Sequence, residues 1–166
     1  MKIIRIIIAL LLLSAHGLAL GGFDEGTAAY LRGDYGTALR EWRPLAEQGD
    51  ADAQLNLGFM YDNGYGVPQD FKEAVIWYRR AAEQGNDRAQ YNLGILYEIG
   101  RGVPQNKVQA HMWYDIAGVS VAVSYRDHVA RKMTPAQITE AQRLASEWKG
   151  RHLVEGWEAS TRMATR

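Results

Sequence analysis

The stretch that decides the fold is "DNGYGVPQD" at residues 62–70, because the chain repeats it 36 residues later as "EIGRGVPQN" at residues 98–106. When residues 34–69 are set above residues 70–105 without a gap, 18 of the 36 positions are identical. Matching of this extent at a fixed spacing is the signature of an internal repeat. The chain therefore consists largely of one structural unit used more than once.

The two glycines that flank Tyr65 first suggest a phosphate-binding loop. Neither copy continues to G-x-G-x-x-G, since Gln69 and Gln105 occupy the last position, and no lysine follows as a Walker A motif requires. Gly64 and Gly100 instead suit the left-handed residue that ends a helix, and a proline four residues later keeps that helix from continuing. We interpret both stretches as connections between helices.

Each 36-residue unit predicts two helices. In 70–84 apolar residues recur at i, i+3, i+4, i+7, i+10 and i+11, which places them on one helical face. Asp70 is a candidate N-cap with Glu73 three residues on, and Gly85 follows the end. A second helix over about 87–99 carries apolar residues at four-residue steps. Such a pair of helices is an α-solenoid unit, which needs neighbours to bury its apolar face.

Residues 53–85, "AQLNLGFMYDNGYGVPQDFKEAVIWYRRAAEQG", resemble the Sel1-like repeat, a relative of the tetratricopeptide repeat. The resemblance extends over roughly 27–119, and the copy that starts at 106 is degenerate. It implies an all-α fold, a right-handed α-solenoid of helix hairpins that serves as a scaffold for protein partners and not as an enzyme. The residues of the first full copy that carry the resemblance are Ala53, Leu57, Gly58, Tyr61, Gly64, Gly66, Val67, Asp70, Ala74, Trp77, Tyr78, Ala81, Ala82 and Gly85.

Two departures from the repeat pattern are predicted to shape its ends. Pro44 falls inside the helix expected over 35–48 and should kink or restart it. Near the C-terminus, Thr134 and Gln137 are placed as N-cap and N3 of a capping helix that closes the stack, with Gly150 past its end. The predicted organisation is a signal peptide (1–20), an N-terminal helix or cap (21–33), repeats over 34–133 (34–69, 70–105 and the degenerate 106–133), the capping helix (134–150), and a tail (151–166) for which helix and disorder both stay open.

The first twenty residues are predicted to be a secretory signal. Lys2 and Arg5 precede an apolar run of about ten residues, and small residues follow. Cleavage fits near Ala19 or Gly21, and the run is too short for a typical membrane-spanning anchor. We therefore expect a periplasmic or secreted protein with no integral membrane span after cleavage; an uncleaved anchor is the alternative.

Composition narrows the classes of function. The chain has no cysteine, which removes disulfides, thiolate metal sites and a cysteine nucleophile. Loss of Lys2 and Arg5 from the 19 basic residues leaves 17, against 19 acidic ones, so the mature chain is close to neutral. No nucleic-acid partner is expected from such a charge. The histidines show no metal-ligand spacing, and His111 with Asp115 at i+4 suits a surface hydrogen bond. We predict no cofactor, no metal and no catalytic residue.

The candidate site is the groove that the second helices of the hairpins line, by analogy with tetratricopeptide repeats. With Leu57 and Leu93 directed inward, the residues one turn round should face a protein or peptide partner, and several of them are apolar where a free surface tolerates polar residues. The alternative is that these apolar residues form a strip that packs on the capping helix or the tail. The predicted partner-binding residues are Asp52, Leu55, Phe59, Asp62, Arg88, Tyr91, Ile95 and Glu98, with Ser124, Asp127 and Arg131 less clearly placed.

Two other functions compete with the adaptor. Ser146 and Lys149 form an S-x-x-K pair, which would suit a cell-wall-acting or penicillin-binding enzyme, although neither S-D-N nor K-T-G accompanies it. A purely structural subunit of an oligomer is the other possibility, and a mass measurement distinguishes it.

Overall fold

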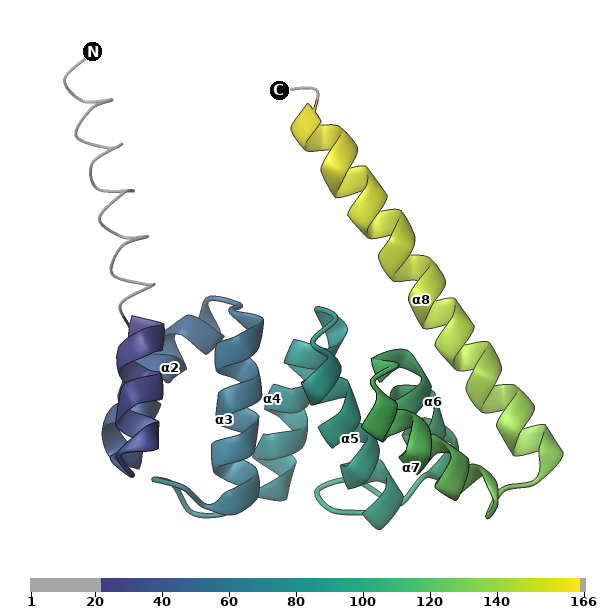
Figure 1. The fold of residues 1–166 in the computed structure, drawn as a ribbon, viewed down its shortest axis with the longest axis horizontal. Coiled ribbons are helices and arrows are strands. Elements are labelled where there is room, and N and C mark those ends of the chain that lie inside the picture. Colours follow the sequence, from purple (N-terminus) through teal and green to yellow (C-terminus); the bar gives the residue numbers. More distant parts are fainter. Residues whose placement is uncertain (1–21, 165–166) are drawn as a thin grey trace. The chain divides into compact units, whose positions relative to one another are not determined.

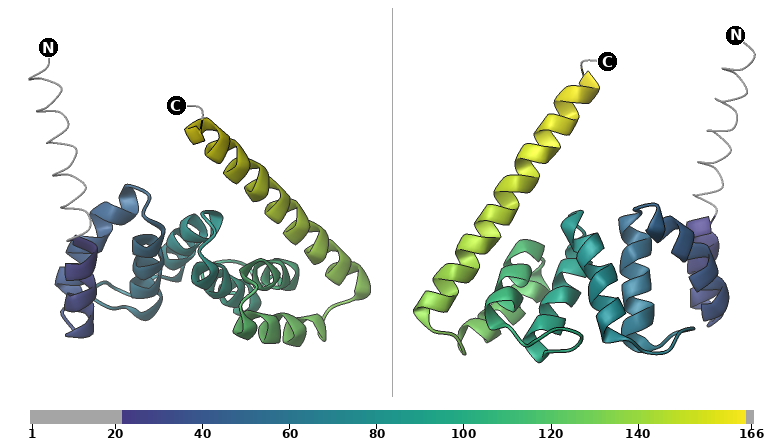
Figure 2. Two further views of the ribbon diagram at one scale, coloured as in Figure 1. Left: turned by 45° about the horizontal axis from the view of Figure 1, so that its top comes forward. Right: turned by 180° about the vertical axis from the view of Figure 1, so that it is seen from behind.

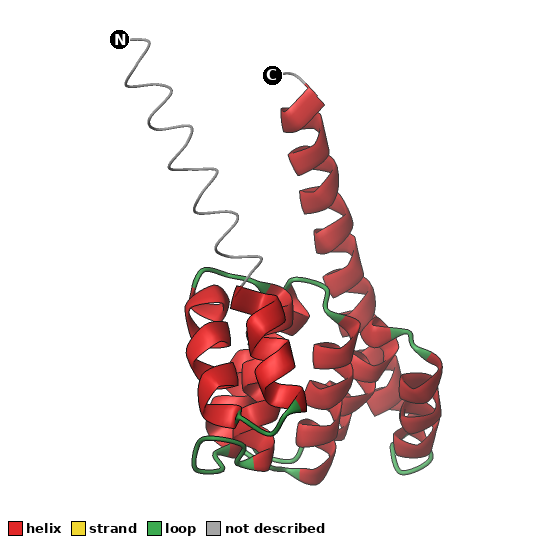
Figure 3. Ribbon diagram, turned by 60° about the vertical axis from the view of Figure 1, so that its left-hand side comes forward, coloured by secondary structure: helices red, strands yellow, loops and turns green. Residues whose placement is uncertain are grey.

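The computed structural model describes residues 22–164, with side chains described for residues 22–154. The predicted signal peptide (1–20) lies outside these residues. Every regular element over the described residues is a helix, as Figure 3 shows. The chain divides into two compact units, 1–81 and 82–166, and the division falls within α4 (Phe71–Glu83). The predicted all-α hairpin architecture is confirmed.

The first unit contains a helix over 22–31, then α2 (Tyr35–Glu47), α3 (Ala51–Asn63) and most of α4, all labelled or coloured in Figure 1. Asp34 and Asp50 cap α2 and α3 by accepting from the backbone N–H groups of Thr37 and Ala53. The core of this unit surrounds Trp42, Leu57 and Met60. Its hairpin α2–α3 is the first of the repeated pairs.

The second unit contains α5 (Asp87–Ile99), α6 (Lys107–Ala117), α7 (Ser120–Ala130) and α8 (Pro135–Ala164). Helix α6 packs against α5 on one side and against α7 and α8 on the others. The two views of Figure 2 show α8 running on beyond α6 and α7. The degenerate third repeat therefore does form a hairpin, α6–α7, even though it lacks the glycine loop of the other copies.

The glycines of the repeat pattern end helices and allow neighbouring helices to approach closely. Gly64 and Gly100 end α3 and α5 in the left-handed conformation, each with a φ of 72°. A Cβ on Gly58 would lie 2.5 Å from the ring of Tyr78, and one on Gly94 would lie 2.6 Å from the ring of Tyr114. Successive hairpins thus approach through the same glycine–tyrosine contact, 36 residues apart, in each unit.

A contact that the sequence did not reveal explains the repeated "AQ" pair. Gln54 is buried, and its Nε2 donates to the Ala46 carbonyl at 3.0 Å; Gln90 does the same to the Ala82 carbonyl at 3.1 Å. These carbonyls lie in the last turn of a helix and also accept from the backbone N–H of Gly49 or Gly85, so the glutamine supplies a second donor to each. The glutamine therefore ties each second helix to the end of the helix before it.

One predicted restart within a helix is not observed, and one predicted helix end is wrong. Helix α2 neither stops nor restarts at Pro44 but continues to Glu47. Pro44 lies within the last turn, so the helix loses one hydrogen bond near an end where few remain. Helix α8 does not end at Gly150 but continues to Ala164, so the region 151–164 is helical. Its start is as predicted, since Thr134 and Gln137 exchange two hydrogen bonds in a capping box.

The turn after Gly150 is held by a tertiary contact. The His152 ring stacks on the Trp148 ring with centroids 3.6 Å apart, and its Nε2 lies 2.6 Å from the Glu83 carbonyl oxygen. This packing offsets the helix-weakening effect of glycine, about 1 kcal/mol in an exposed helix interior. Contacts between elements, and not local propensity, carry α8 past Gly150.

Candidate partner-binding surface

The predicted site residues of the first unit lie on α3, and the structure gives them unequal exposure. Phe59 is 38% exposed and Asp52 is exposed, whereas Leu55 and Asp62 are half-buried. Asp62 accepts a hydrogen bond from the Tyr78 hydroxyl at 3.4 Å, so it also joins α3 to α4. In this unit the strip combines an exposed aromatic face with a carboxylate that stabilises the fold.

Phe59 belongs to an aromatic group of the first unit. Its ring lies 6.3 Å from Tyr30 on the N-terminal helix and 5.9 Å from Tyr65 in the glycine-rich loop. Tyr65 in turn stacks on Tyr35 with centroids 4.6 Å apart. The rings fix one another while part of Phe59 stays accessible, an arrangement that suits a preformed apolar contact surface.

The predicted site residues of the second unit lie on α5. Arg88 is exposed, and Tyr91, Ile95 and Glu98 are half-buried. Glu98 accepts from the Tyr114 hydroxyl at 2.8 Å, the counterpart of the contact between Asp62 and Tyr78. Desolvation, followed by the hydrogen bond and charge of Glu98, raises the pKa of Tyr114 strongly, so its hydroxyl remains a donor at any ordinary pH.

Tyr91 is covered in part by a residue that the sequence did not single out. The Tyr125 ring on α7 meets the Tyr91 ring edge-on with centroids 5.4 Å apart. Burial raises the pKa of Tyr91 to about 12, and a hydrogen bond with Tyr125 contributes. Tyr125 is itself 41% exposed, so it presents the outer surface of this aromatic pair.

A hollow of about 420 Å³ opens beside Tyr125. It brings together Glu98, which was a predicted site residue, with Ser124 and Arg131, which were placed less clearly. Tyr125 and His128 complete the lining and were missed. Their signal in the sequence was weak because α7 lacks the repeat pattern; the four-residue steps from Val121 to Tyr125 and on to Val129 mark an apolar face there without showing which of its residues are exposed. Asp127 is engaged with Arg126 on the neighbouring face.

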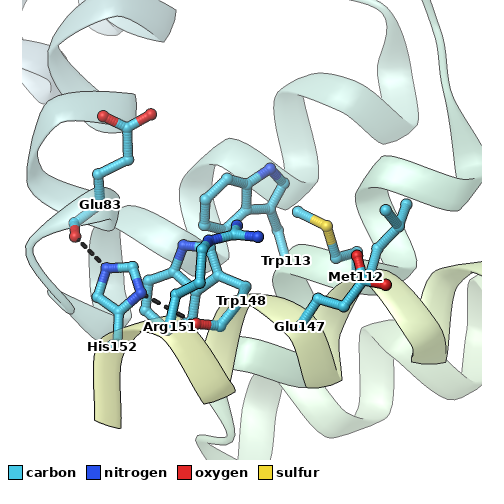
Figure 4. Close-up of a pocket in the computed structure, with 8 residues that line it drawn as sticks. Glu83, Met112, Trp113, Glu147, Trp148, Arg151 and His152 are labelled. Atoms are coloured by element: carbon cyan, nitrogen blue, oxygen red, sulfur yellow. Dashed lines mark hydrogen bonds between the residues drawn. The ribbon is translucent and has the colours of Figure 1, made fainter. Parts of the chain in front are cut away.

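A second hollow, of about 370 Å³, lies under α8 and is drawn in Figure 4. Its labelled indoles, Trp113 and Trp148, lie 6.1 Å apart, and the His152 ring points to the Glu83 carbonyl. Both ring nitrogens of His152 face carbonyl oxygens, those of Glu83 and Trp148. These contacts attach α8 to the end of α4 and to the middle of α6, so we assign this hollow to the packing of the capping helix.

The S-x-x-K pair has a structural explanation. Lys149 Nζ donates to Asp115 twice, to the carboxylate Oδ2 at 3.0 Å and to the backbone carbonyl at 3.0 Å. Arg126 binds the other carboxylate oxygen of Asp115 at 3.0 Å. Burial alone would raise the pKa of Asp115, but the hydrogen bonds from Lys149 and Arg126 outweigh it and lower that pKa. Lys149 therefore acts here as a cation that joins α8 to α6, and Asp115 joins three helices.

His111 is not the surface residue that the sequence predicted. It is 3% exposed, and its Nδ1 has no hydrogen-bond partner. The residues at the same repeat position, 36 and 72 residues earlier, are Val75 and Leu39. Burial lowers the pKa of His111, so the ring is held in its neutral form. Over the described residues no group of three or more histidines or acids is placed to hold a metal ion.

Comparison with known proteins identifies the repeat. A family model described as Sel1 repeat matches residues 51–86 and 87–118. The chain carries Sel1 repeats. The two matches cover α3 with α4 and α5 with α6, so the family model divides this part of the chain one helix out of phase with the hairpins described above.

Solved structures show the same fold. One is c5321, a protective antigen present in uropathogenic Escherichia coli strains displaying an SLR fold, with 30% identity and a TM-score of 0.79; the match covers 90% of this chain and 33% of that one. Another is a Sel1 repeat protein from Oxalobacter formigenes, with 30% identity, a TM-score of 0.63, and coverage of 76% and 55%. This Sel1-repeat chain thus spans about a third and about half of their lengths. None of the curated proteins compared with it matches.

No helix over residues 22–164 combines the length and the hydrophobicity that a bilayer span requires.

Proposed function

We propose that this Sel1-repeat chain is a non-enzymatic adaptor of the bacterial envelope that holds a segment of a partner protein on the exposed faces of its second helices. The observation that carries the proposal is the partly exposed aromatic surface on these helices, Phe59 in the first unit and Tyr125 beside the hollow of the second. Interfaces are enriched in aromatic residues that are rigid before binding, and both rings are fixed by neighbouring rings.

The adaptor is tested by affinity capture from an envelope extract with the chain from residue 20 onward. Phe59→Arg and Tyr125→Arg each place a charge on the proposed surface, where about 10 to 100-fold weaker binding is expected for a contact at the interface centre. The matched control is Ile76→Arg, because Ile76 is also apolar and 42% exposed but lies on a first helix, α4. Circular dichroism confirms that all variants remain helical.

A specific partner should be retained by the wild type and by Ile76→Arg and lost by at least one surface variant. If every variant retains the same partner equally, the second helices are not the docking surface. If no protein is retained and the chain assembles with itself, the structural-subunit alternative replaces the adaptor.

The envelope location is a separate part of the proposal, supported by the signal-like sequence of residues 1–20. Mass spectrometry of the chain recovered from a periplasmic fraction should show a mature start near residue 20 or 22. Recovery from the cytosol with Met1 and Lys2 retained would contradict it.

A further inference from the structure

The end of α7 gathers basic groups with no acidic partner among the residues whose side chains are described. Lys132 Nζ lies 2.7 Å from His128 Nε2, and Arg131 Nη2 lies 3.3 Å from His128 Nδ1. Lys107 joins them from α6 by donating to the Lys132 carbonyl at 3.2 Å. Four basic residues thus meet at one turn, beside the hollow that Arg131 and His128 line.

The hydrogen bonds within this basic group are incomplete. A neutral imidazole has one N–H and a single acceptor nitrogen, while lysine and arginine can only donate. His128 can therefore accept from Lys132 or from Arg131, but not from both, and a protonated ring accepts from neither. At least one cation is left facing a donor, an arrangement that a bound anion would relieve.

The two preceding second helices end with the opposite charge. Helix α3 ends near Asp62 and α5 near Glu98, and each acid accepts from the tyrosine hydroxyl of the next first helix. Helix α7 has no further repeat to contact, and its end is basic. One base at a helix C-terminus is explained by the helix dipole, worth about 0.3–1 kcal/mol. That effect gives no reason for three residues within five positions, His128, Arg131 and Lys132.

An apolar surface lies next to the bases on the same helix. Val121 is 47% exposed and Tyr125 is 41% exposed. With His128 they follow the i, i+4, i+7 spacing, so these three residues lie along one face of α7, and Lys132 follows in the turn after the helix with its Nζ 2.7 Å from His128 Nε2. The face is apolar in its N-terminal half, and basic side chains gather at its C-terminal end and in the turn that follows.

We propose that this face and the adjoining hollow bind an acidic peptide segment of the partner protein. An apolar side chain of the segment rests on Val121 and Tyr125, and its carboxylates meet His128, Arg131 and Lys132. Glu98 on the α5 wall of the hollow repels a carboxylate there and so fixes the direction of the segment. The inference rests on the proposed adaptor function and specifies the chemistry of its ligand.

The geometry sets the spacing within the segment. Tyr125 lies five residues before Ala130, the last residue of α7, which is about 7.5 Å along the helix, and the bases Arg131 and Lys132 stand just beyond that end. An extended peptide advances about 3.3 Å per residue. The apolar side chain and the first carboxylate should therefore be separated by about three residues.

The test uses fluorescein-labelled eight-residue peptides of serine and glycine with one phenylalanine, and a pair of glutamates placed one to five residues after it. Binding to the full chain is measured by anisotropy at low salt and at about 200 mM salt. Affinity should peak near a spacing of three, fall at least about tenfold when both glutamates become glutamine, and fall as salt rises.

Variants locate the site. Arg131→Glu should weaken the best peptide at least about tenfold, while Lys72→Glu, an equal charge reversal at an exposed residue of α4, should leave binding within about twofold. Equal binding of the glutamine peptide, or equal loss in both variants, overturns the acidic site.

The outcomes separate this inference from the adaptor proposal. Neutral peptides that bind as well as acidic ones, and that Tyr125→Arg releases, would overturn the acidic specificity and leave the docking surface in place. If the chain binds neither acidic nor neutral peptides, that result counts against both the acidic site and the docking surface. Arg131-dependent binding to vesicles with 20% anionic lipid, without peptide binding, would overturn the peptide in favour of a membrane surface.

Discussion

The first two second helices and the third differ in what their exposed ends do. At the ends of α3 and α5, Asp62 and Glu98 serve the contact with the next hairpin, and the same chemistry recurs 36 residues apart. At the end of α7 there is no next hairpin, and the bases there have no such structural task. The comparison teaches that what repeats in register maintains the stack, and that what departs from the register is the place to look for specific binding.

The largest effect is expected where the repeat is strictest. Gly58→Ala and Gly94→Ala each force a Cβ to within 2.5–2.6 Å of a buried tyrosine ring, Tyr78 or Tyr114. We expect each change to lower the free energy of unfolding by about 2–3 kcal/mol, because the ring is packed and cannot retreat. Urea unfolding followed by circular dichroism measures both.

Gly36→Ala is the control, since the nearest non-neighbouring atom to a Cβ at Gly36 lies 3.9 Å away. If only Gly58→Ala lowers the free energy of unfolding, the Gly58–Tyr78 and Gly94–Tyr114 contacts are not equivalent.

The three-helix contact of the terminal hairpin should come next. Asp115→Asn removes the charge that Arg126 and Lys149 share. We expect the free energy of unfolding to fall by about 1–2 kcal/mol, less than for a fully buried ion pair, because both cations are partly exposed. Since the folded pKa of Asp115 is lowered, its contribution is present above the unfolded pKa of about 3.9 and is lost as pH falls through the folded value. Thermal unfolding of both proteins from pH 7 to pH 3 checks this. If the difference in stability between the wild type and Asp115→Asn is as large at pH 3 as at pH 7, the proposed role of the Asp115 charge is contradicted.

His111 offers a sharper comparison, because the equivalent residues of the other copies are apolar. Its folded pKa is lowered, so the folded state resists protonation, and stability is lost as pH falls from about 6.5 toward the folded pKa. One such group changes the free energy of unfolding by at most about 1.4 kcal/mol per pH unit. The groups that act on it are Asp115, Arg126 and Asp127. His111→Val installs the residue found at position 75.

In His111→Val the fall in stability between pH 7 and pH 5 should be smaller than in the wild type. Urea unfolding at several pH values measures it, and His128→Gln is the control, as an exposed histidine of the same unit. Identical pH profiles for the wild type and His111→Val would mean that the buried ring does not couple folding to protonation.

The smallest effect concerns the glycine that did not end a helix. A Cβ on Gly150 meets nothing within 4 Å, and α8 continues through it. Gly150→Ala should therefore stabilise the chain by about 0.5–1 kcal/mol, since alanine is the better helix former. A change of this sign, opposite to that of Gly58→Ala, is measurable by thermal unfolding. Destabilisation would mean that the helix bends or opens at residue 150.

Local signals in the sequence predicted the hairpins correctly, and their failures share one cause. Gly64, Asp70 and Thr134 act through atoms a few residues away, so the sequence shows what they do. Pro44 and Gly150 carry equally clear local signals, yet α2 does not restart at Pro44 and α8 does not end at Gly150, because packing of the helix outweighs a penalty of one hydrogen bond or about 1 kcal/mol.

The candidate site was predicted in part for the same reason. The repeat register placed Phe59, Tyr91 and Glu98 on the second helices, and the structure keeps all three at least partly accessible. Tyr125 and His128 lie in α7, where the register fails, and only the fold brings them next to Glu98. Exposure of the strip also depends on rings from other helices, such as Tyr30 beside Phe59.

The sequence by itself determined that this chain is a stack of helix hairpins, since glycine conformation, capping and apolar spacing are set within one repeat. Only the tertiary structure decided that Lys149 binds Asp115, that His111 is buried without a partner for Nδ1, and that the bases of α7 stand beside an open hollow. Burial and charge pairing depend on which side chains from distant positions in the sequence come into contact. A repeat pattern predicts those contacts only within the residues that follow the repeat.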